Sequence, residues 1–138
     1  MRFMLLMIPA GYETAAPGTM PPLEAVEKMM RFNEQLKEAG VLVTLDGLHP
    51  PSMGARVSFK DGKPVVTDGP FTESKEVIGG YWMIDVASRE EAIDWATLCP
   101  ASANEVIEIR QVMEMADMPA DLQDAVSGFA EMQKRAVH

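Results

Sequence analysis

The sequence predicts a single α+β domain in which two helices pack on one face of an antiparallel sheet. Short strand-like segments alternate with two amphipathic helical segments, and an Asp-Gly pair between β-forming residues marks a hairpin in the middle of the chain. The length of 138 residues suits one domain, and 47% hydrophobic with 24% charged residues is typical of a globular chain.

The first half of the chain predicts a strand, a loop, a helix and a second strand. Residues 3–8 form a short apolar run, and residues 9–22 are a proline- and glycine-rich loop that could be mobile or could cover a cleft. Apolar residues then recur at helical spacing over 22–39, before Gly40 ends the helix. Residues 41–45 are rich in β-branched residues and predict the next strand.

The second half predicts a hairpin, then a strand, a helix and a last strand. Residues 56–59 and 64–67 flank the Asp-Gly turn, and a strand is expected over 77–86. Ser88 and Glu91 form a capping box for a helix that ends before Pro100. A strand over 105–112 and one C-terminal helix from about Pro119, with an apolar stripe, complete the order. This β-α-β-β-α-β core is the ferredoxin-like arrangement.

Strand patterning also predicts a homodimer. Antiparallel strands with one wet face alternate apolar and polar residues, but residues 3–8 and 81–84 are apolar on both faces. Two helices cover only one face, so a second copy of the sheet is the expected cover for the other. We expect residues 1–116 to form this core and 117–138 to be a helical extension of the same domain.

Composition excludes several classes of function. A net charge of −9 disfavours nucleic acid and anionic membrane surfaces. Cys99 is the single cysteine, so no internal disulfide is possible, and with only His49 and His138 as further soft ligands no zinc site is expected. There is no phosphate-binding glycine loop or dinucleotide fingerprint, so no cofactor is expected. No secretory signal or membrane span is evident, which predicts a cytoplasmic protein.

The densest cluster of turn, charge and glycine signals spans residues 67–81. Asp68 before Gly-Pro is either a turn-former or a carboxylate that faces a ligand. Phe71 is expected to fill the core in preference to acting as a stacking platform. Lys75 belongs either to a solvated charge run with Glu73 and Glu76 or to a cleft where it contacts an anion or carbonyl. Gly79-Gly80 inside a strand predicts a bulge, or else the close approach of a backbone or ligand.

Four other residues are candidates for a site. His49 is the default group for proton transfer, although a loop histidine is more often solvated. Tyr81 shares a face of its strand with Met83 and Asp85. Glu108 and Arg110 share a face of the last strand, where they form a salt bridge with each other or with a dimer mate, or line a cavity in which Arg110 clamps a carboxylate. Cys99 is expected to be a small buried thiol and not a nucleophile.

The string Asp68-Gly69-Pro70-Phe71, with Gly79-Gly80-Tyr81 behind it, resembles the DGPF branch of the YCII-related family. The resemblance extends from the first strand to about residue 116. It implies a dimeric α/β-barrel, in which two ferredoxin-like sheets face each other. In another branch a histidine of the first helix and an aspartate before the helix-ending proline form a proposed catalytic pair. The corresponding positions here fall close to Met29 and Cys99, and neither residue can supply that chemistry.

Two functions remain open from the sequence. The chain could be an enzyme acting on a small anionic or carbonyl-containing molecule, with His49, Asp68 and Glu108 as acid/base groups and with Lys75, Tyr81 and Arg110 binding the substrate. Alternatively, it is a non-catalytic module that binds a metabolite or a protein. The resemblance implies a regulatory role for such a module, because members of this branch are associated with sigma-factor systems.

Overall fold

Four strands form one antiparallel sheet in a computed structural model that describes residues 1–71 and 74–136. The strand order is β2-β5-β1-β6, and every neighbouring pair is antiparallel. The strands are β1 (Arg2–Ile8), β2 (Leu42–Gly47), β5 (Gly80–Asp85) and β6 (Val106–Gln111). With one helix between β1 and β2 and another between β5 and β6, this α+β architecture is consistent with a ferredoxin-like fold, as predicted.

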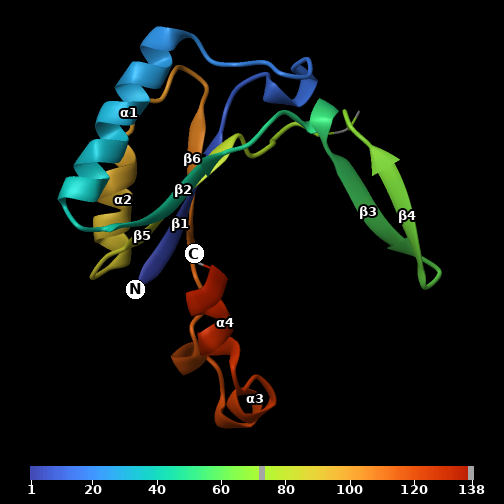
Figure 1. The fold of residues 1–138 in the computed structure, drawn as a ribbon, viewed down its shortest axis with the longest axis vertical. Helices are drawn as coiled ribbons and strands as arrows, with labels where there is room; N and C mark the ends of the chain where they lie inside the picture. Colours follow the sequence, from blue (N-terminus) through green and yellow to red (C-terminus); the bar gives the residue numbers. More distant parts are fainter. Residues whose placement is uncertain (72–73, 137–138) are drawn as a thin grey trace.

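Both helices of the core lie on the same side of the sheet, α1 (Leu23–Glu38) beside α2 (Arg89–Thr97) (Figure 1). The capping box predicted for α2 is present. The hydroxyl of Ser88 accepts from the amide of Glu91 at 3.1 Å, and the Glu91 carboxylate accepts from the amide of Ala87 at 3.0 Å. These bonds satisfy amides that the first turn of a helix leaves free.

The core lies between the helices and one face of the sheet. Phe32 of α1 and Trp82 of β5 meet edge to face, with ring centroids 5.4 Å apart. Alternate residues of the central strands point into this layer. The buried core residues are Phe3, Leu5, Met7, Phe32, Leu36, Trp82, Ile84, Val86 and Ala92.

The opposite side of the sheet, called here the open face, carries no helix of the core (Figure 1). The strand register places Met4 between Met83 and Arg110, and Leu6 between Tyr81 and Glu108. The apolar side chains at its centre are half-buried by one another. Other residues of this face are Arg2, Ile8, Asp85 and Val106.

The predicted hairpin is present as β3 (Ala55–Lys60) and β4 (Lys63–Asp68), a separate two-stranded sheet. Asp61 and Gly62 turn the chain with φ of 52° and 76°, the region that an Asp-Gly pair tolerates best. Residues 55–68, called here the arm, project from the side of the sheet opposite the helices (Figure 1). Every residue of both strands is exposed.

The C-terminal segment differs from the prediction. A helix does begin near Pro119, but it consists of two short pieces, α3 (Ala120–Ala125) and α4 (Phe129–Ala136). Gly128 lies between them at φ 90°, a conformation incompatible with a continuous α-helix. Half of the expected apolar stripe is exposed: Leu122 and Met132 retain 50% and 67% of their surface, whereas Val126 and Phe129 are half-buried.

Three short 3₁₀ turns complete the chain: η1 (Tyr12–Thr14), η2 (Pro51–Met53) and η3 (Met115–Asp117). Arg2 of β1 holds the segment before η3, since its guanidinium donates to both carboxylate oxygens of Glu114 at 2.7 and 3.0 Å. No helix in the described part of the chain is long and apolar enough to cross a membrane.

Candidate functional site

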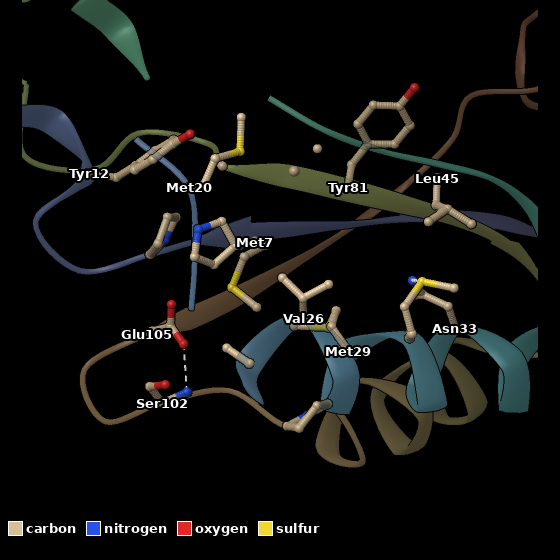
Figure 2. Close-up of a pocket in the computed structure, with 18 of the residues that line it drawn as sticks. Met7, Tyr12, Met20, Val26, Met29, Asn33, Leu45, Tyr81, Ser102 and Glu105 are labelled. Carbon is tan, nitrogen blue, oxygen red and sulfur yellow. Dashed lines mark hydrogen bonds between the residues drawn. The ribbon is translucent and has the colours of Figure 1, made fainter. Parts of the chain in front are cut away.

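A cavity of about 500 Å³ lies between α1, one end of the sheet and residues 9–22 (Figure 2). This volume is in the range of pockets that hold small organic molecules. Val26 and Met29 point into it from α1, and Met7 points toward them from β1. Further lining comes from Pro9, Tyr12, Met20, Met30, Asn33, Leu45, Gly47, Gly79, Gly80, Trp82, Pro100 and Glu105.

Residues 9–22 form one wall of the pocket, so the expectation that this loop could cover a cleft is confirmed. Three hydrogen bonds tie the loop to the segment between β2 and the arm, one of them from the amide of Gly18 to Sδ of Met53. The Tyr12 hydroxyl donates to the carbonyl of Leu48 at 2.6 Å, and the Ser52 hydroxyl donates to the carbonyl of Ala15 at 2.9 Å. Burial raises the pKa of the Tyr12 phenol, which therefore remains a hydrogen-bond donor at neutral pH.

The glycine pair Gly79-Gly80, where β5 begins, has a different reason from the bulge that the sequence favoured. A Cβ on Gly79 would lie 2.7 Å from Cγ of Pro9, and one on Gly80 would lie 3.0 Å from the carbonyl oxygen of Asp46. The one register shift of this sheet in the described residues falls in β2, between Leu42 and Thr44. The pair thus permits close approach of two chain segments, the other possibility that the sequence left open.

Most polar side chains of the pocket are already hydrogen-bonded to the protein. The Asn33 amide oxygen accepts from the indole nitrogen of Trp82 at 2.7 Å, so the buried indole has a partner. At the rim, the Glu105 carboxylate accepts from the backbone amide of Ser102 (Figure 2). The remaining surface is mainly aliphatic, aromatic and thioether, which favours apolar ligands over ions.

Cys99 and Met29, the two residues that the resemblance placed near a catalytic pair of another branch, are in contact here. Sγ of Cys99 lies 3.9 Å from Sδ of Met29, and Met29 lines the pocket. Burial, with a smaller contribution from the negative charge of Glu105, raises the pKa of the Cys99 thiol to about 11. The thiol is therefore neutral at physiological pH, and neither sulfur can exchange protons as a histidine–aspartate pair does.

Tyr81 is the predicted site residue that lies at the pocket, but its side chain points to the other side of the sheet (Figure 2). Its hydroxyl donates to a carboxylate oxygen of Asp46 at 3.1 Å on the open face. This hydrogen bond raises the pKa of Tyr81, since the carboxylate stabilises the protonated phenol.

Glu108 and Arg110 lie together on the open face. Their side chains form an ion pair of 3.5 Å, one of the arrangements that the sequence predicted for them. Both are solvent-accessible, with 48% and 71% of their side-chain surfaces exposed. Within one chain they are therefore separated from the pocket by the sheet itself.

The remaining predicted site residues lie near the arm and do not line the pocket. His49 is exposed in the segment after β2, Asp68 is the exposed last residue of β4, and Lys75 is exposed in the segment before β5. Among the residues described, no hydrogen bond or ion pair joins these three side chains to one another. Glu73, which was considered with Lys75, lies outside the described residues.

Phe71 differs from its predicted role as a filler of the core. It is half-buried and lies outside the core cluster. The guanidinium carbon of Arg56 lies 4.0 Å from the centre of its ring, and Arg56 also donates to Ser74 at 2.8 Å. Phe71 thus helps to fix the base of the arm through a cation–π contact.

The sequence did not identify the residues that make this pocket. Tyr12 and Met20 lie in a loop whose sequence has no hydrophobic periodicity. Asn33 lies on a helix face that carries both polar and apolar residues. The signal that could have found them was indirect: two glycines at Gly79-Gly80 require a close neighbour. Across the described residues, no group of three His, Cys, Asp or Glu side chains could hold a metal ion.

Comparison with known proteins gives two matches. The YCII-related domain matches residues 1–116. The uncharacterized protein R00369 of Rhizobium meliloti (strain 1021) is 38% identical over 77 residues, which cover 53% of this chain. The matched region spans 62% of the length of that relative. Because the domain covers most of the sequence, the chain belongs to the YCII-related family.

Proposed function

We propose that this YCII-related protein binds a small, mainly apolar organic molecule in the pocket between α1, the sheet and residues 9–22. One observation carries the proposal: the cavity of about 500 Å³ is lined by thioether, aromatic and aliphatic groups whose polar neighbours are internally bonded. Methionine side chains are flexible and polarisable, so Met7, Met20, Met29 and Met30 suit aromatic or aliphatic ligands of varied shape.

The pocket favours binding over acid/base catalysis. A general acid or base must reach the reacting proton to within hydrogen-bond distance or through one water. The groups at the matching positions are the neutral Cys99 thiol and the Met29 thioether, and Glu105 is at the rim with its carboxylate already accepting a backbone amide. A carrier or sensor of an apolar metabolite fits these groups better than an acid/base enzyme does.

We also propose that the protein is a homodimer formed by packing of two open faces. The half-buried centre of that face, with Met4, Leu6 and Met83, supports this, as does the absence of a core helix over it in the described chain. In such a dimer Glu108 and Arg110 would line a cleft between the two sheets. A carboxylate-bearing ligand in that cleft is the competing site for a small molecule.

A thermal-shift screen against small aromatic and aliphatic metabolites tests the proposal. A ligand at 100 times its Kd stabilises by about 2.7 kcal/mol, enough to raise Tm by several degrees. Met30→Trp fills the pocket from an exposed position on α1, and Arg110→Ala is the matched change on the open face. If the ligand binds in the pocket, Met30→Trp should abolish the thermal shift and Arg110→Ala should preserve it. Hits lost in Arg110→Ala alone would instead indicate the inter-sheet cleft.

A further inference from the structure

The arm has one apolar side that no other residue of the described chain covers. The register pairs Val57 with Val66 and Phe59 with Pro64, so these four side chains share one side of the two-stranded ribbon. Val57, Phe59 and Val66 leave 54%, 77% and 67% of their surfaces exposed. The other side holds Arg56, Ser58, Lys60, Lys63, Val65 and Thr67.

This pattern needs a cover. Alternation of apolar and polar residues is the pattern of a strand with one buried face. A two-stranded hairpin alone is marginally stable in water and requires packing against another element. Yet the arm's strands are exposed throughout, and its link to the body is at its base, where the amide of Gly69 donates to the carbonyl of Gly54 at 2.9 Å.

We propose that the apolar side of each arm packs against a second copy of this chain, so that two arms clasp the dimer formed by the open faces. The inference rests on the proposed homodimer and names the element that secures it. The arm projects from the same side of the sheet as the open face, where that second copy would lie (Figure 1). A two-fold dimer then uses each arm once, and no arm is left for further copies.

Area supports a second copy as the occupant. Six residues at about 3.3 Å and two strands about 4.8 Å apart give one side of the arm an outline of roughly 200 Å². The four-stranded open face has an outline of roughly 400 Å² by the same spacings. A stable dimer buries about 800 Å² of accessible surface per partner, so neither surface suffices alone and the two together approach it.

Charge also supports a second copy. Lys60 and Lys63 lie directly opposite each other at the tip of the arm, a pairing of like charges that disfavours an isolated hairpin. The arm carries three basic and two acidic residues, so the remainder of the chain, with −9 overall, has a net charge of −10. The body of another copy therefore offers the acidic surroundings that this lysine pair lacks.

Two neighbouring valines give a matched test, because Val66 lies on the apolar side of the arm and Val65 on the polar side. Sedimentation equilibrium of the full chain should show a dimer whose Kd rises at least about tenfold in Val66→Ser and in Phe59→Ser. Val65→Ser should leave the Kd within about twofold. Circular dichroism checks that each variant is folded. All three variants should fold, because the substituted side chains are exposed in the unmodified chain.

A charge reversal at the tip gives an independent reading. The double variant Lys60→Glu/Lys63→Glu should have a higher dimer Kd than the unmodified chain at low salt. This difference in Kd should shrink as the salt concentration rises. If Arg110→Glu on the open face weakens the dimer while Val66→Ser and the tip reversal do not, the homodimer stands and the role of the arm is wrong. A chain that stays monomeric contradicts both. Assembly beyond dimers, abolished by Val66→Ser, would mean arm-to-arm pairing and would also overturn the clasp.

Discussion

Sγ of Cys99 lies 3.9 Å from Sδ of Met29, and Met29 lines the pocket. The contact joins the end of α2 to the pocket-lining face of α1. Neither a neutral thiol nor a thioether can exchange protons as a histidine–aspartate pair does. This contact favours ligand binding in the pocket over acid/base catalysis there.

The first prediction concerns the Cys99 thiol. Because burial raises its pKa to about 11, alkylation by iodoacetamide at pH 8 should be at least about tenfold slower in the folded protein than in denaturant. The rate should rise as the pH approaches 11. Rapid alkylation of the folded chain at pH 8 would show an accessible thiolate and contradict the neutral Met29–Cys99 contact.

The same shift predicts a pH dependence of stability. The unfolded thiol deprotonates near pH 9 and the folded one near 11, so the folded state holds its proton more tightly in between. The free energy of unfolding is unaffected by this group below pH 9 and falls as the pH rises from 9 through 11. Relative to Cys99→Ala, the loss should be about 1 kcal/mol, because the thiol is only half-buried.

The second prediction concerns the ion pair between Arg2 and Glu114. Hydrogen bonding from Arg2 lowers the pKa of Glu114, so this carboxylate stabilises the fold above its unfolded pKa of 4.5. That stability is lost as the pH falls through the lower, folded pKa. At pH 7, Glu114→Gln should lower the free energy of unfolding by about 1 kcal/mol, with urea unfolding as the measurement.

The control for this pair is Glu24→Gln. Glu24 pairs with Lys28 on α1, but its side chain is 81% exposed, and such pairs contribute at most about 0.5 kcal/mol. The Glu114→Gln variant and the unmodified protein should converge in stability as the pH falls through the folded pKa of Glu114, which lies below 4.5. Equal effects of the two substitutions at pH 7 would show that the bidentate geometry adds nothing.

The third prediction uses two glycines of the pocket. Gly79→Ala places a methyl group 2.7 Å from the ring of Pro9, so residues 9–22 must move. The free energy of unfolding should fall by about 1–3 kcal/mol. The Kd of any pocket ligand should rise at least about tenfold. Gly47→Ala, which meets nothing within 4 Å, should cost little of either. Equal affinities for a ligand in both variants would mean that the loop does not shape its site.

Much of the architecture follows from local patterns in the sequence. The capping box at Ser88, the Asp-Gly turn and the period-two alternation of Tyr81 and Trp82 are decided by near neighbours along the chain. The break at Gly128 was missed because the apolar spacing of residues 119–132 continues across it, while the backbone at that glycine does not. Spacing alone does not record where a helix is interrupted.

The site was harder to predict because its residues are joined only by tertiary packing. The alternation showed that Glu108 and Arg110 share a face, but not that α1 and the pocket lie on the other side of the sheet. Charged residues are obvious candidates for a site in a sequence, whereas no sequence pattern around Tyr12 and Met20 marks them as lining a pocket. The glycine pair was the one local trace of the close approach between β5 and residues 9–22.

The most direct test of the pocket uses the methionines of the chain as built-in probes. Met7, Met20, Met29 and Met30 line the pocket, whereas Met4 and Met83 lie on the open face. In a protein labelled with ¹³C at the methionine methyl groups, NMR spectra are recorded with and without a thermal-shift hit. If the ligand binds in the pocket, the methyl signals of the pocket methionines should shift and those of Met4 and Met83 should not. Shifts confined to Met4 and Met83 would place the ligand between the sheets and contradict binding in the pocket.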